Sequence, residues 1–282
     1  MVTNQPREVN QSVVNEKSPA VAMYPWSSRS TPTGLPSGLT TSLTARAWDN
    51  NGAVGTSVAN VTINWSVYQS DAATNGADAL IANQSHATTK YGAMSILEVA
   101  SSEEPYDSRT LVRFDVTPLS FHATVGVIVL QLTASYVHRE SAGPYLLNVY
   151  RATNSWVEAD VTWNQRQNGA TWATAGGEYD TNVLATFDWS GLTGTSLTVD
   201  ASHEQFNIEI LPGQSNAEAR TALINAWLAG NNNGLLLRQQ TEGLHNNDFL
   251  GIRSREQPTG AYHPRLFIYY IPPPAGTVIT FW

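Results

Sequence analysis

The sequence contains no cysteine, which excludes disulfide bonds, zinc sites built on thiolates and thiol nucleophiles. Charged residues are scarce at 13%, about half the usual share for a soluble domain, so a charged coiled coil and an acidic disordered tail are excluded. Only two of the 15 basic residues are lysines, Lys17 and Lys90, and the formal net charge is −8. Nucleic-acid binding needs a basic face, and no Lys/Arg cluster is present, so we expect no nucleic-acid partner.

Long apolar runs are absent as well. No run approaches the roughly 20 residues that a membrane-spanning helix needs, so we expect no membrane insertion. Residues 1–22 lack a basic start followed by an apolar core, and no signal peptide is expected. With 41% hydrophobic residues in 282, the chain can still build a sizeable core.

The first 70 residues divide into two segments. Residues 1–40 are polar and punctuated by Pro and Gly, which predicts an extended arm that docks through Trp26 or, alternatively, a disordered tail. In residues 41–70, two alternating segments, Ser42–Trp48 and Ser57–Trp65, flank an Asn-Gly turn and predict a β-hairpin. This hairpin resembles the closing strands of bacterial immunoglobulin-like repeats.

Residues 71–271 predict one all-β domain with a jelly-roll-like β-sandwich fold. Short apolar segments alternate with Gly, Asn, Ser and Pro, which is typical of sandwiches. The predicted strands are Ala79–Ile81, Ile96–Val99, Thr110–Asp115, Val127–Val137, Leu146–Arg151, Leu197–Asp200, Gly234–Gln239 and Arg265–Tyr270.

One short helix interrupts the predicted strands. Ser215 and Glu218 have the spacing of a capping box, and Gly230 is a suitable end. Between them, Leu223, Ile224, Trp227 and Leu228 provide an apolar face. We expect this helix to lie across one end or face of the sandwich.

Residues 272–282 form a separate C-terminal tail. Three consecutive prolines stop the last strand, and an apolar hexamer, Thr277–Trp282, follows. An exposed apolar terminus favours aggregation unless it docks on something, so we expect docking on a partner subunit. The side chains expected to dock are Val278, Ile279, Phe281 and Trp282.

Several motifs occur in a defined order over about 190 residues. They are Asp78–Ile81, Tyr91-Gly92, Leu97–Val99, Arg109–Asp115, Trp156–Arg166, Ala226–Gly230, Asn233–Arg238, Ser254–Glu256 and His263–Leu266. Together they resemble the DNRLRE (disaggregatase-related) family, which overlaps a family of carbohydrate-binding modules. The resemblance implies a mostly non-catalytic jelly-roll-like sandwich, some relatives of which bind acidic polysaccharides such as alginate. The N-terminal extension and the Pro-rich tail depart from the family pattern.

The densest motif also provides the candidate glycan site. Aromatic rings stack on sugars, and carboxylates or amides bind sugar hydroxyls or a cation. The alternative is structural: the tryptophans cap the core and the carboxylates pair with Arg166 or cap the turn. The candidate glycan-binding residues are Trp156, Glu158, Asp160, Trp163 and Asn164.

Two further candidate sites are weaker in sequence. Glu103, Glu104 and Asp107 share one loop and could bind Ca²⁺, although three carboxylates do not complete such a site and a solvated acidic loop is the alternative. Arg109, Arg113, Arg253 and Arg255 predict arginine–carboxylate pairs at sheet edges, with partners such as Asp115 and Glu256. A positively charged groove for uronates is the alternative for these arginines. No other cofactor is expected.

No motif predicts an enzyme. The six histidines form no His-x-His or His-Glu-x-x-His pair, and no Gly-x-Ser-x-Gly elbow or Gly-rich phosphate loop is present. A hydrolase or lyase built on scattered carboxylates is the least favoured alternative. The first hypothesis is therefore a structural and adhesive component of a bacteriophage virion surface: a decoration, fibre or appendage protein. We expect it to form a homo-oligomer and to contact other virion subunits and polysaccharide. The second hypothesis is a secreted or cell-surface bacterial carbohydrate-binding module.

Overall fold

A computed structural model describes residues 39–48, 54–63, 66–71, 76–101, 106–119, 123–193, 204–243 and 247–271. Several expectations lie outside these residues. They are the arm with Trp26, the strand at 197–200, the acidic pair Glu103 and Glu104, and the tail with Val278, Ile279, Phe281 and Trp282.

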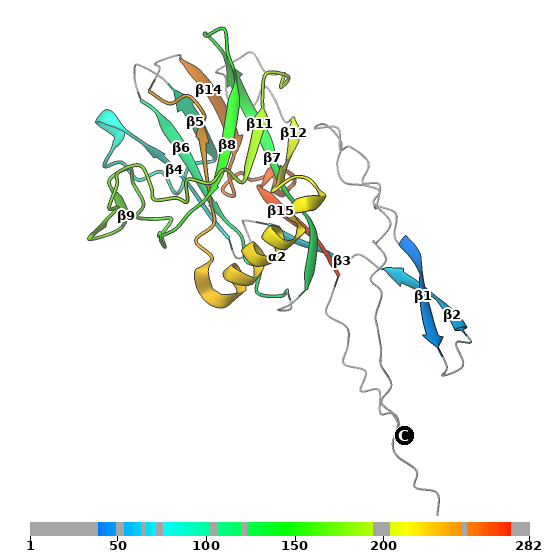
Figure 1. Cartoon of the computed structure of the whole chain (residues 1–282). Coiled ribbons are helices and arrows are strands. Elements are labelled where there is room, and N and C mark those ends of the chain that lie inside the picture. Colours follow the sequence, from blue (N-terminus) through cyan, green and yellow to red (C-terminus); the bar gives the residue numbers. More distant parts are fainter. Residues whose placement is uncertain are drawn as a thin grey trace, which may run out of the picture.

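The domain is an antiparallel β-sandwich, as the sequence predicts, and its sheet is nearly closed (Figure 1). Its strands follow the order β11-β8-β13-β6-β5-β14-β7-β15-β3, with β12 added to β7 and β4 added to β6. Their bounds are β3 Ser66–Asp71, β4 Ala77–Ala82, β5 Ile96–Ser101, β6 Ser108–Arg113, β7 Thr124–His138, β8 Leu146–Arg151, β11 Ala185–Asp188, β12 Gln205–Ile210, β13 Leu235–Gln239, β14 Asp248–Arg253 and β15 Arg265–Ile271. Strands β3, β11, β12 and β14 were not among the predicted strands.

The long strand β7 joins the two halves of the sandwich. Its first part pairs with β15 on one edge and with β12 on the other, and its last part, Ala134–His138, pairs with β14. Because one strand belongs to both halves, the sheet curves around a single main core. Buried side chains from nearly every strand fill that core, including Phe114, Ile128, Phe206 and Leu250.

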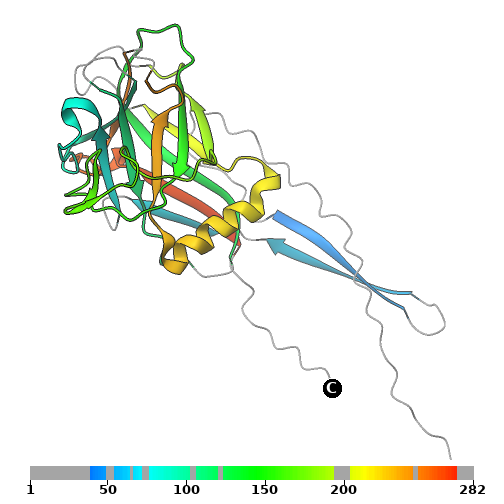
Figure 2. The ribbon, with the colours of Figure 1, turned by 60° about the vertical axis from the view of Figure 1, so that its left-hand side comes forward.

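The predicted helix is present as α2, Ala217–Ala226, and lies across the end of the sandwich where β7 begins (Figure 2). Leu223, Ile224 and Trp227 are buried against the main core, and Gly230 ends the helical path at φ 95°. The capping box is wrong: the N-cap is Asn216, and no side chain caps the first turn. Within the described residues, α2 and the other helical segments are all too short and polar to cross a membrane.

The predicted hairpin is also present. Strands β1 (Leu39–Trp48) and β2 (Val54–Ile63) pair antiparallel, with Trp48 opposite Val54. Strand β3 then pairs with β15, so the sandwich sheet already starts at Ser66, before the expected domain boundary at residue 71.

A second apolar cluster lies outside the main core and positions the candidate site. In β4, Ala77, Ala79 and Ile81 belong to this cluster, whereas Leu80 belongs to the main core. This alternation shows that both faces of β4 are buried. The covering loop, residues 152–184 between β8 and β11, buries this outer face through Trp156, Val161 and Trp172. Within it, two short strands, β9 (Gln165–Gln167) and β10 (Ala170–Thr171), pair with each other.

Candidate functional site

Trp156 lies near the start of the covering loop and is only 2% exposed. Its indole Nε1 donates to the carbonyl of Asn233 at 2.8 Å, and the guanidinium of Arg113 lies 5.1 Å from its ring centroid. The faces of this ring are covered by protein atoms, so the structure gives Trp156 the core-capping role that we considered as the alternative to sugar stacking.

Trp163 differs from Trp156 because it is only partly buried. The guanidinium of Arg109 lies 4.7 Å from its ring centroid and 5.6 Å from that of Tyr179. Such contacts hold an aromatic ring in one orientation while part of it stays open to solvent. Trp163 is therefore partly accessible to solvent, whereas Trp156 is not.

Arg109 is itself fixed by a carboxylate. Its Nε and Nη2 donate to the two oxygens of Glu242 at 2.8 and 2.7 Å, and its Nη1 donates to the carbonyl of Gly176 at 2.6 Å. Arg238 shares Glu242 at 2.9 Å. The predicted arginine–carboxylate pairing is present here, although its partner, Glu242, was not among the expected residues.

Asp160 and Asn164 lie on the outer surface of the covering loop, beside the segment that precedes β5. Lys90 donates to Asp160 Oδ1 at 2.7 Å, and this hydrogen bond lowers the pKa of Asp160. Asn164 is exposed, and its backbone N–H donates to the carbonyl of Ala87 at 3.2 Å. Lys90 and Asn164 are thus exposed and Asp160 partly exposed, whereas the Trp163 ring of the same loop packs beside Arg109.

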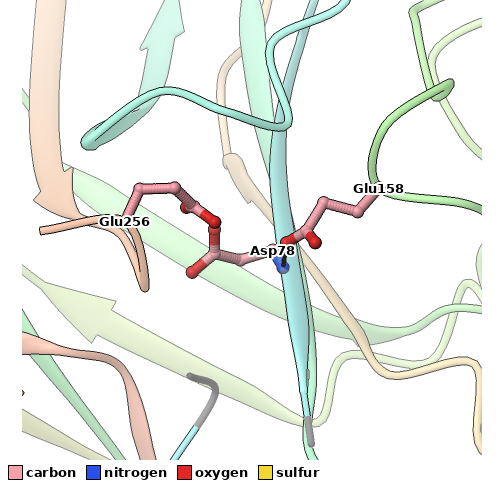
Figure 3. A group of neighbouring side chains, drawn as sticks. All are labelled: Asp78, Glu158 and Glu256. Atoms are coloured by element: carbon pink, nitrogen blue, oxygen red, sulfur yellow. Dashed lines mark hydrogen bonds between the residues drawn. The ribbon is translucent and has the colours of Figure 1, made fainter. Parts of the chain in front are cut away.

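Glu158 points inward to a second group of charged side chains (Figure 3). Its Oε1 accepts the backbone N–H of Asp78 at 2.8 Å, and its Oε2 pairs with Arg255 at 3.0 Å. Asp78 Oδ2 accepts the backbone N–H of Arg255 at 2.8 Å, and Arg255 Nε lies 3.4 Å from Glu256 Oε1. Three motifs that are distant in sequence therefore meet at one acidic cluster, formed by Asp78, Glu158 and Glu256.

Burial dominates the electrostatics of this acidic cluster. It raises the pKa of Asp78 well above its ordinary value, and the nearby charges of Glu256 and Glu158 raise it further, against the backbone hydrogen bond from Arg255. Burial also raises the pKa of Glu158. The expected pairing with Arg166 is wrong, because Glu158 binds Arg255, Asp160 binds Lys90 and Arg166 donates to Ser155.

The remaining predicted residues have other environments. Asp107 is 8% exposed and shares three hydrogen bonds with Asn83, at 3.1, 2.8 and 3.1 Å. Asp115 accepts the backbone N–H of Thr117 at 2.9 Å, and Arg253 is buried in β14. A calcium site at the loop of Asp107 stays a prediction, since Glu103 and Glu104 lie outside the described residues.

Residues 69–208 match the model of carbohydrate-binding module family 96. The matched segment runs from β3 to β12 and contains the whole covering loop. The chain is thus similar to a carbohydrate-binding module over this segment, as expected from the motifs. No curated protein matches the chain.

Proposed function

We propose that this chain is a non-enzymatic carbohydrate-binding protein whose covering loop contacts a polysaccharide. The observation that carries the proposal is the match of residues 69–208 to a family of carbohydrate-binding modules. Modules of this kind bind sugars without chemistry, which agrees with the lack of any catalytic motif in the sequence. The match favours the carbohydrate-binding hypothesis over the virion component that we placed first.

In this proposal, Lys90, Asp160, Trp163 and Asn164 supply the groups that contact the sugar. Trp163 offers a partly open ring for stacking, and the exposed amide of Asn164 can donate to and accept from sugar hydroxyls. Asp160 and Lys90, whose side chains are 28% and 49% exposed, add further hydrogen-bonding groups. Trp156 and Glu158, also predicted from sequence, would act indirectly by fixing the covering loop to β4.

Affinity electrophoresis tests this proposal. The purified chain is run through gels that contain alginate, other acidic glycans or neutral glycans, beside W163A, N164A and E218A. Glu218 is exposed on α2, so its substitution is the control. We expect at least one glycan to retard the wild type and E218A, and W163A and N164A to migrate faster in that gel. A wild type that no glycan retards, or a W163A variant retarded like the wild type, would overturn the proposed site.

The virion role of the first hypothesis depends on docking through Trp26 and residues 278–282, all outside the described residues. Docking, homo-oligomer formation and location on a virion surface stay predictions. Deletion of residues 277–282 tests them, because assembly should be lost while the sandwich stays folded.

A further inference from the structure

Two carboxylate oxygens in the acidic cluster are buried without a donor. Asp78 is fully buried, and while its Oδ2 accepts from Arg255, its Oδ1 accepts no hydrogen bond from any described residue. Glu256 Oε2 is in the same situation. A buried acceptor without a hydrogen-bond donor lowers the stability of the folded state by about 1–3 kcal/mol, and by more when it is charged. A positively charged partner at these two oxygens would remove that cost.

The geometry places these oxygens together. The carboxyl groups of Asp78 and Glu256 point toward each other, and Glu158 approaches Asp78 from the other side (Figure 3). One oxygen from each of the three lies within 4.8 Å of the others. Oxygens at this spacing are close enough to bind one ion, because Ca²⁺–oxygen distances are about 2.3–2.6 Å.

The local charge is also incomplete. When all three carboxyl groups are ionised they contribute −3, and their ion-pair partner Arg255 contributes +1, which leaves −2. Arg113 contributes a weaker, more distant attraction to Glu158, and its guanidinium lies over Trp156. A divalent cation balances the three carboxylates and Arg255, and it removes the repulsion between Asp78 and Glu256.

We propose that Asp78, Glu158 and Glu256 bind a hard divalent cation of the Ca²⁺ class. All three offer oxygen ligands, which Ca²⁺ prefers over nitrogen or sulfur. The side chains of Glu158 and Glu256 are 22% and 25% exposed, so the cluster borders solvent, from which water would supply the rest of the six to eight ligands that Ca²⁺ requires. This site differs from the loop of Asp107, where the sequence predicted calcium.

The cation would join three segments that are far apart in the chain. Asp78 is on β4, Glu158 is in the covering loop and Glu256 follows β14. A ligand that binds only the folded arrangement of these segments stabilises the folded state. Cation binding would therefore hold the covering loop on the sheet, whether or not a glycan is present.

Calorimetry and thermal unfolding test the proposal. The full chain is treated with EDTA, dialysed and titrated with Ca²⁺ and, separately, with Mg²⁺. We expect saturable binding of one Ca²⁺ per chain and a rise in unfolding temperature that EDTA reverses. E256Q keeps the size of the side chain, and we expect it to weaken Ca²⁺ binding about tenfold or more. E218Q should bind Ca²⁺ like the wild type.

Two results would overturn the cation site. One is a wild type with neither heat of binding nor a shift in unfolding temperature at millimolar Ca²⁺ or Mg²⁺; a proton shared by Asp78 and Glu256 would produce this result. The other is unchanged Ca²⁺ binding by a folded E256Q. If E256Q does not fold, E158Q replaces it as the test variant. The titration of the wild type remains a valid test even if neither variant folds. These measurements use no glycan, so they are independent of the proposed carbohydrate binding.

Discussion

Tyr136 donates its phenolic hydroxyl to the carboxylate of Glu98 across an intervening strand. Gly251 of β14 pairs with Glu98 on one side and with Tyr136 on the other, so the three residues form one row across the sheet. The ring of Tyr136 lies directly over Gly251, where a Cβ atom would be 2.4 Å from two of its ring carbons. Only a residue without a side chain lets Tyr136 reach Glu98.

We predict that G251A destabilises the protein by about 1–3 kcal/mol, the usual range for overpacking a filled site. The added methyl group must displace the Tyr136 ring and weaken its hydrogen bond to Glu98. Urea unfolding measures the loss. G260A is the matched control, because a Cβ atom there has no contact closer than 3.6 Å. Equal stability of the two variants would contradict the prediction.

The second prediction concerns Glu98 and pH. Burial raises its pKa above the ordinary value of 4.5, although hydrogen bonds from Tyr136, Ser108 and Tyr106 act in the opposite direction. The folded state therefore holds the proton more tightly than the unfolded state. Its stabilising contribution is complete below the unfolded pKa and is lost as the pH rises through the folded pKa.

E98Q cannot titrate, so we expect the stability of the wild type relative to E98Q to fall as the pH rises from the ordinary glutamate pKa of 4.5 through the higher folded pKa. Thermal unfolding of both proteins across this range measures the difference. If the unfolding temperatures of the wild type and E98Q show the same dependence on pH, Glu98 does not contribute to the pH dependence of stability.

The third prediction separates the two tryptophans of the covering loop. W156A removes a fully buried ring and its hydrogen bond to Asn233, so we expect a loss of about 3–5 kcal/mol. W163A removes a partly exposed ring and should cost clearly less stability. Chemical unfolding of both variants checks this order, and a larger loss for W163A would contradict it.

The fourth prediction concerns Glu242, whose side chain is only 7% exposed and pairs with both Arg109 and Arg238. E242Q leaves two largely buried guanidinium groups without a charged partner, and we expect a loss of about 3–5 kcal/mol. K90A breaks the solvent-exposed pair with Asp160, which water and salt screen, so its loss of stability should be clearly smaller. Similar losses in the two variants would show that burial does not strengthen the Glu242 pairs.

The sequence alone determined the all-β class, the hairpin, most of the strands and the apolar face of the helix. Alternation of apolar residues, Asn-Gly turns and the position of Gly230 are local features, so they are readable without a structure. Strand β14 could not be predicted from the sequence because Gly251 interrupts its apolar pattern. This same glycine allows the Tyr136 side chain to reach Glu98 across β14. The helix start was misplaced because Ser215 and Asn216 are both good caps, and neither local spacing nor composition chooses between them.

Only the tertiary structure decided which charged residues meet. Arg109 and Glu242 are 133 residues apart, and Arg255 binds an oxygen of Asp78 from 177 residues away. The sequence pointed to the motifs that contain Asp78, Glu158 and Glu256, but not to their convergence. The tertiary structure also gives Trp156 and Trp163, which belong to the same motif, different burial. Such contacts depend on how the strands are ordered and on how the covering loop folds over them, and neither is encoded in any single stretch of residues.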